Sequence, residues 1–247
     1  DNEVFVTSFL RELGFLAPRT YLISSKINGV SGKYIFQEDL GKEFLENAQL
    51  IEGPILEGDE RFTVMKKDEY MIPGLALSRL SNKKFSLKGD TNGKIALSAV
   101  SNLNLVYLQN HQILSPEALR IPSFVLDILH INTEKFFLDK SNKERFQTYE
   151  SLIYALGANH AQSGDDRRFY FDPINKYYIP IYYDGKADIF NNKNTELDED
   201  EYFQSTFPDA KKGALKAIAL INNIDHDIFF KELMNSGLDL SIKKYKN

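Results

Sequence analysis

The 247-residue chain contains no cysteine, which excludes disulfide bonds, thiolate metal ligands and cysteine nucleophiles. The absence does not identify a compartment, because cysteine-free proteins occur both inside and outside cells. No run of about 20 apolar residues is present, so we expect no membrane span in this chain. The net charge of −5 argues against a basic binding surface, and we expect no nucleic acid among the partners.

The residues that are present form an ordinary globular composition, with 43% hydrophobic and 26% charged residues. Tryptophan is missing, and 18 Phe and 13 Tyr supply much of the apolar surface. The length is sufficient for one large core or for two lobes. The first residues are typical of a helix rather than of a signal peptide, so the numbering is compatible with a start inside a larger protein.

Apolar spacing and turn signals predict the order of the elements. The amino-terminal part is predicted to contain a helix at 1–14, a strand hairpin at 21–27 and 33–38, and a short helix at 43–50. The rest is predicted to contain an exposed loop at 88–94, helices at 95–110, 123–138 and 144–159, strands at 169–171 and 177–183 around a turn at 172–176, a solvated acidic loop at 196–201, and one or two helices over 209–234. Early strands followed by helices and one later hairpin indicate an α+β fold with two lobes.

Polar side chains gather at both ends of the later hairpin. The loop before it contains Asp165, Asp166 and Arg168, and Asp184-Gly185 follows its second strand. Because the two ends of a hairpin lie side by side, we expect these carboxylates to approach one another. Such carboxylates suit Mg²⁺ or Mn²⁺ that bridges phosphate oxygens, while one of them orients a hydroxyl or takes its proton. Gly185 is expected to let the backbone turn sharply behind the ligand.

The same residues also have a purely structural interpretation. Asp-Gly after a strand is a common turn, and a sequence such as 165–168 is a common solvated loop with ion pairs. His160 begins this polar loop and is a candidate catalytic residue, but taken alone it is typical of a capping or core histidine. The other three histidines, His111, His130 and His226, do not stand at the spacing of a metal triad.

The amino-terminal residues carry a resemblance to a known family. The matching stretches are LGFLAPR at 13–19, INGVSGKYIFQE at 27–38 and KEFLE at 42–46. They resemble the spore-coat CotH family, which has LG-x-x-AP, then NG-x-x-x-G-x-Y-x-x-x-E, then a run similar to K-x-FLE. The segment from Asp166 to Asp184 is similar to the family's later Asp-containing loop and the strand that ends in Asp. In all, the resemblance covers about positions 1–50 and 145–190.

This resemblance implies a protein-kinase-like fold. It implies a partial amino-terminal lobe over 1–50, with helix, hairpin and hinge, and a larger helical lobe over 51–247 that contains the catalytic hairpin. The activity it implies is ATP-dependent phosphorylation of Ser or Thr in a protein substrate, a coat or surface protein, with Mg²⁺ or Mn²⁺. A spore-coat, secreted or cell-surface location follows from the resemblance alone.

The resemblance also implies roles for individual residues. Asp184 matches the metal-binding Asp, and Glu38 matches a Glu of the hinge region beside the nucleotide. Asp166, or alternatively Asp165, matches the catalytic-loop Asp. Glu3 matches the glutamate that pairs with a phosphate-binding lysine.

Two departures from the family pattern leave alternatives open. Arg168 stands before Phe169 where the family has a metal-binding Asn; an arginine cannot bind a cation, but Arg168 or Arg167 can hold a phosphate. The order of elements also places the phosphate-binding lysine before the helix of Glu3, so it either precedes Asp1 in a longer protein or is absent from a degenerate relative. The hypotheses are therefore an active kinase, an inactive pseudokinase or scaffold that binds a protein partner, and a metal-dependent phosphoesterase or nuclease.

Overall fold

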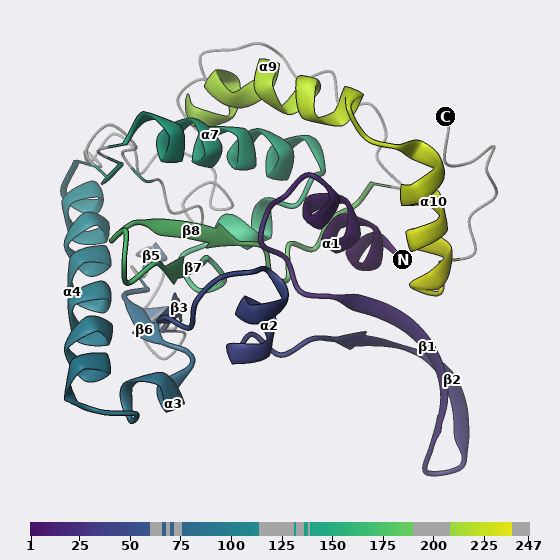
Figure 1. Cartoon of the computed structure of the whole chain (residues 1–247), viewed down its shortest axis with the longest axis horizontal. Coiled ribbons are helices and arrows are strands. Elements are labelled where there is room, and N and C mark those ends of the chain that lie inside the picture. Colours follow the sequence, from purple (N-terminus) through teal and green to yellow (C-terminus); the bar gives the residue numbers. More distant parts are fainter. Residues whose placement is uncertain are drawn as a thin grey trace.

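The computed structural model describes residues 1–59, 66–67, 70–71, 76–113, 131, 136–137, 139–189 and 208–238. Most of the helix predicted over 123–138 and the whole acidic run at 196–201 lie outside these residues. The fold is α+β, as predicted, with small antiparallel sheets and many helices (Figure 1). Among the described helices, none is at once long enough and apolar enough to cross a membrane.

The amino-terminal elements confirm the predicted order. They are helix α1 (Asn2–Glu12), strands β1 (Thr20–Ile27) and β2 (Val30–Gln37), and helix α2 (Lys42–Asn47). Strands β1 and β2 pair from Thr20–Gln37 to Ile27–Val30. Asn28 and Gly29 both have positive φ angles, 50° and 85°, as a two-residue hairpin turn requires. The hairpin projects away from the body of the molecule (Figure 1).

A four-stranded antiparallel sheet lies at the centre of the fold, with strand order β6-β3-β7-β8. Its strands are β3 (Ile55–Gly58), β6 (Ser78–Leu80), β7 (Arg168–Phe171) and β8 (Tyr178–Ile181). Strand β8 is shorter than predicted, and its pairing with β7 ends at Ile181. Beyond it, the Tyr182 amide donates to the Leu16 carbonyl at 2.8 Å. A separate two-stranded sheet pairs β4 (Lys66–Lys67) with β5 (Tyr70–Met71).

The remaining described helices are α3 (Lys83–Ser86), α4 (Asp90–Ile113), α7 (Lys140–Ala155), the 3-10 helix η3 (Asn159–Gln162), α9 (Pro208–Asn222) and α10 (His226–Asn235). They pack on this sheet or on one another, with α9 against α7 and α10 against α1. The prediction of an exposed loop at 88–94 was wrong, because α4 already begins at Asp90, whose charge suits a helix amino terminus. Helix α7 begins at Lys140, earlier than predicted, because the Asp139 side chain accepts from the Asn142 amide at 2.8 Å.

The β7–β8 hairpin is buried on both faces, which fixes the position of its two ends. Phe169 and Tyr178 pack with Phe146 of α7 and with apolar residues of α4. On the opposite face, Tyr170 and Ile179 pack with residues of α2 and of the α1–β1 connection. Alternate residues along a strand point to opposite faces, so each strand contributes to both clusters. The loops at the hairpin ends are therefore attached to a rigid support.

Helices α7 and α9 lie side by side along the molecule, in very close contact (Figure 1). Gly213 of α9 faces the backbone of α7, where an added Cβ would collide with the Gln147 carbonyl and lie 2.5 Å from the Thr148 nitrogen. The Ser151 hydroxyl also donates to the Ala210 carbonyl across this contact. A side chain at position 213 would therefore push the two helices apart.

We expect Gly213→Ala to lower the free energy of unfolding by about 1–3 kcal/mol, the usual cost of overpacking a tight contact. Gly93→Ala is the matched control, since the nearest atom to its added Cβ is the Ser86 carbonyl oxygen at 3.6 Å. Gly93 is also helical, so its replacement should leave stability unchanged or raise it by up to about 1 kcal/mol. Urea unfolding measures both variants, and equal stability of the two would contradict the close-contact explanation.

Candidate functional site

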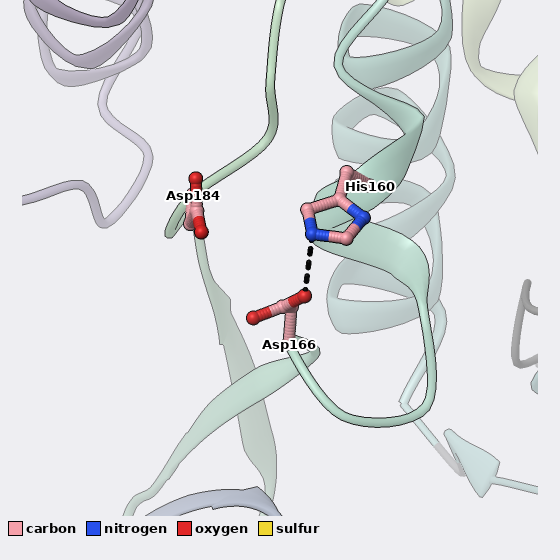
Figure 2. A group of neighbouring side chains, drawn as sticks. All are labelled: His160, Asp166 and Asp184. Carbon is pink, nitrogen blue, oxygen red and sulfur yellow. Dashed lines mark ion pairs between the residues drawn. The ribbon is translucent and has the colours of Figure 1, made fainter. Parts of the chain in front are cut away.

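Three side chains converge at the end of the β7–β8 hairpin: His160, Asp166 and Asp184. His160 lies on η3, Asp166 on the loop before β7, and Asp184 on the segment after β8 (Figure 2). One ligand atom from each lies within 4.8 Å of those of the other two. This confirms the expected approach of Asp166 and Asp184, and these three residues could hold a metal ion.

The loop before β7 holds Asp166 through hydrogen bonds of its own. The Asp166 amide donates to the Ser163 hydroxyl at 3.3 Å, and His160 Nε2 lies 2.9 Å from Asp166 Oδ2. The single Ser163 proton is shared between Asp165 Oδ1, at 2.6 Å, and Asp166 Oδ2, at 3.2 Å. Asp165 is thus tied to Ser163 and is not a member of the three-residue group.

Burial raises the pKa of Asp166, and the negative charges of Asp165 and Asp184 raise it further, while His160 and Ser163 act in the opposite direction. Ionised Asp166 is therefore disfavoured by its surroundings as they stand. A bound cation would favour the ionised form, because an opposite charge nearby stabilises a carboxylate.

Asp184 is held by an unusual backbone. Both Asp184 and Lys186 have positive φ angles, 41° and 49°, whereas Gly185 between them does not. The expectation that Gly185 makes the sharp turn is therefore corrected: aspartate tolerates this conformation better than most residues and adopts it here. Glycine is needed at position 185 for lack of space, because an added Cβ would lie 2.6 Å from both Cε2 and the hydroxyl oxygen of Tyr182.

Glu3 of α1 reaches the same region through Tyr182. The Tyr182 hydroxyl donates to Glu3 Oε2 at 2.9 Å, and Tyr182 is fully buried. Burial raises the pKa of Glu3, the Tyr182 hydroxyl opposes this, and the negative charge of Asp184 raises it again. No lysine or arginine in the described part of the chain forms an ion pair with Glu3. The resemblance implies that Glu3 belongs to this site, and the structure brings it near Asp184.

Arg167 lies in a separate, buried cluster. Its guanidinium pairs with Glu150 of α7 at 3.1 Å, and its side chain is only 3% exposed. Gln162 donates to the other Glu150 oxygen at 2.7 Å. Burial raises the pKa of Glu150, and Arg167 opposes that shift. Arg167 therefore anchors the loop to α7, and its guanidinium points away from the three-residue group into the core.

Arg168 sits on the other side of the loop. Its guanidinium carbon lies 3.5 Å from the centre of the Tyr183 ring, and Nη1 lies 3.4 Å from Glu57 Oε2 on β3. Its Nε is buried, and the described residues offer it no hydrogen-bond partner. The guanidinium of Arg168 is thus held by a carboxylate and by the ring of Tyr183, the residue before Asp184.

Glu38 is not brought to the three-residue group. Arg19 donates to it from the guanidinium at 2.7 Å and from the backbone at 3.1 Å, and Asn47 donates at 2.9 Å. These contacts join the start of β1 to the end of α2. The role that the resemblance implies for Glu38, beside a nucleotide, stays a prediction.

Sequence reasoning did not identify the partners that shape this site. It treated His160 as a lone histidine, and it did not single out Ser163, Glu57 or Gly58. The carboxylate partner of His160 stands six residues later in a 3-10 turn and loop, a connection with no fixed periodicity. Glu57 and Gly58 lie more than a hundred residues away, so no local pattern points to them.

Gly58 of β3 lets the loop before β7 approach the sheet. An added Cβ would collide with the Gly164 carbonyl and lie 2.5 Å from Asp165 Cα. We expect Gly58→Ala to displace Asp166 and to weaken Mn²⁺ binding at least about tenfold, as loss of supporting contacts does at metal sites. Gly41→Ala is the control, since its nearest neighbour would be Asp39 Oδ2 at 3.6 Å. Calorimetric titration with Mn²⁺ checks both, and unchanged affinity in folded Gly58→Ala would contradict this role.

No protein-family model matches the chain, and no curated protein matches it. A function for the chain is therefore argued from the geometry of the three-residue group.

Proposed function

We propose that the chain binds a divalent cation through His160, Asp166 and Asp184 and acts as a CotH-like kinase. The reaction is transfer of the γ-phosphoryl group of ATP to a Ser or Thr hydroxyl of a protein substrate. The observation that carries the proposal is the convergence of these three side chains where β7 begins and β8 has ended.

The arrangement of the remaining elements supports a protein-kinase-like fold. Helix α1 comes first, then the β1–β2 hairpin, α2, a mainly helical part, the loop of Asp166, the β7–β8 hairpin and finally Asp184. This is the order that the resemblance to the family implies. Glu3 lies near Asp184, with a buried carboxylate oxygen that lacks a hydrogen-bond partner among the described residues. A kinase-like site pairs this glutamate with a basic group, and no lysine or arginine of the described residues forms that pair.

The three residues have different roles in this proposal. Asp184 is exposed, so its carboxylate is accessible to a ligand from solvent. Asp166 is half-buried, and its carboxylate accepts the hydrogen bond of the substrate hydroxyl and takes its proton. His160 Nε2, which lies 2.9 Å from Asp166 Oδ2, would supply the nitrogen ligand of the cation. A bound divalent cation supplies charge neutralisation for the phosphate oxygens.

The donor set favours Mn²⁺ over Mg²⁺. Mg²⁺ prefers oxygen ligands, whereas an imidazole nitrogen suits transition metals. We expect Mn²⁺ to bind more tightly than Mg²⁺, and Asp184→Asn to weaken Mn²⁺ binding at least about tenfold. Asp188→Asn is the matched control, because it removes the same charge from an exposed residue four positions later. The electron paramagnetic resonance signal of free Mn²⁺ measures each affinity, and equal affinity in wild type and Asp184→Asn would refute the metal centre.

An inactive scaffold of the same fold that binds a protein partner is the second candidate. It is favoured by Arg168, which stands where the family has a metal-binding Asn and is held by Glu57 and Tyr183. In that case the site has lost a ligand that the reaction uses, and the three-residue group serves only to hold the fold or a cation.

Incubation with labelled Mn²⁺–ATP distinguishes the two candidates. The kinase proposal expects labelled phosphate on the protein or on added protein substrates, and loss of the label in Asp184→Ala and Asp166→Ala. Asp188→Ala should retain the label. A folded wild-type chain that binds Mn²⁺ but transfers no phosphate with Mn²⁺ or Mg²⁺ would favour the scaffold.

A further inference from the structure

A second hollow lies on a different part of the surface. It has a volume of about 940 Å³ and lies between the α1–β1 connection, the end of α2, the first turns of α7 and the start of β8. We call it the α2–α7 cleft. His160, Asp166 and Asp184 are not among its described lining residues, so it is separate from the metal centre. Its volume is within the range of about 300–1,000 Å³ that is typical of small-molecule sites.

The described lining of this cleft is positively charged, although the chain as a whole is negative. It contains Arg11, Arg19 and Arg145, and one carboxylate, Glu38. Burial alone would raise the pKa of Glu38, but the hydrogen bonds from Arg19 and Asn47 hold it below its usual value. Glu38 is therefore ionised and already occupied. Arg11 pairs with Glu232 of α10 at 2.6 Å.

Arg145 has no such partner. Within the described residues, no carboxylate lies within ion-pair distance of its guanidinium. It donates to the Gly14 carbonyl, and its guanidinium carbon lies 5.3 Å from the centre of the Phe15 ring. A guanidinium has five N–H donors. Among the described residues, Arg145 donates only to the Gly14 carbonyl, so its other donors are available to a ligand. The ring and the carbonyl fix its plane at the cleft wall, which suits two parallel hydrogen bonds to a carboxylate or phosphate.

The neighbours of Arg145 complete a site with one polar and one apolar part. Burial raises the pKa of the Tyr177 hydroxyl, and the nearby positive charge of Arg145 only partly opposes this. The Tyr177 hydroxyl therefore keeps its proton. Ser141 and Asn142 of α7 add neutral polar groups. Apolar side chains, among them Phe15, Leu50 and Ile179, line the rest. The cleft thus offers donors for an anion beside a surface for an apolar group.

We propose that the α2–α7 cleft binds a small organic anion, a carboxylate or phosphate monoester attached to an aromatic or apolar group. Arg145 binds the anionic group, and the apolar lining contacts the remainder of the ligand. This site shares no described lining residue with the metal centre, and anion binding in it does not require kinase activity. Its lining does include Glu38, for which the resemblance implies a place beside the nucleotide.

Phenyl phosphate is a suitable probe, with inorganic phosphate and phenol as its two halves. In calorimetric titrations of the full chain with EDTA present, wild type should bind phenyl phosphate saturably and more tightly than either half. Arg145→Gln should weaken binding at least about tenfold, because hydrogen bonds to charged groups are worth that factor. Arg145→Lys keeps the charge and the long side chain but loses the planar fork, so it should also bind more weakly than wild type.

Two control variants test whether the effect is local. Lys216 is an exposed residue of α9 that pairs at 3.0 Å with Glu144, the residue before Arg145. Lys216→Gln removes one positive charge close to Arg145 but should bind phenyl phosphate as wild type does. Asp184→Asn should also bind it normally, since the metal centre is separate. The proposal is overturned if wild type shows no saturable binding, if both Arg145 variants match wild type, or if Lys216→Gln weakens binding as much as Arg145→Gln. Loss of binding in Asp184→Asn would overturn the separation of the two sites.

Discussion

The buried ion pair between Arg167 and Glu150 is the contact on which the geometry of the candidate site depends. It joins the loop before β7 to the middle of α7, and Gln162 completes the hydrogen bonding of Glu150. Removing one partner of such a pair leaves a buried charge, at a cost of about 3–5 kcal/mol. The loop between Gln162 and Arg168 therefore has both of its ends fixed, one by the hydrogen bond from Gln162 to Glu150 and the other by Arg167 and β7. Asp166 lies in the middle of that loop, so its position follows from the two attachments.

The candidate site concentrates negative charge in a confined space. The negative charge of Asp184 raises the pKa of both Asp166 and Glu3. Each of the three is placed by a different element: the loop before β7, the segment after β8, and α1. Burial raises the pKa of both Asp166 and Glu3, so the folded chain holds these carboxylates in surroundings that disfavour their charge. A cation relieves this penalty, which is why the same arrangement that costs stability suits metal and phosphate chemistry. Arg168 does not supply that charge, since Glu57 and Tyr183 hold its guanidinium.

The β7–β8 hairpin also separates the two candidate binding sites. The candidate metal site lies where β7 begins and after β8 has ended, whereas Tyr177 and Ile179, at the opposite end of β8, line the α2–α7 cleft. Helix α7 contributes to both: its buried face holds Glu150, and its first turns carry Arg145. The two sites therefore rest on the same rigid elements without sharing a side chain.

The sequence by itself determined the local structure around these sites. Apolar spacing gave α1, α4 and α7, and turn residues gave both hairpins, because these features depend on neighbours within a few positions. The approach of Asp166 and Asp184 was also predictable from the sequence, since the two ends of a hairpin lie side by side. The start of α4 was missed because a Gly- and Asn-containing stretch resembles a loop, although Asp90 makes a suitable helix amino terminus. Only the tertiary structure decided that His160 pairs with Asp166, that Gly58 of β3 makes room for their loop, and that Arg167 pairs with Glu150. It also decided that no carboxylate among the described residues pairs with Arg145. Each of these depends on contacts between elements that are distant in sequence or joined by irregular loops, and no periodic pattern encodes such contacts.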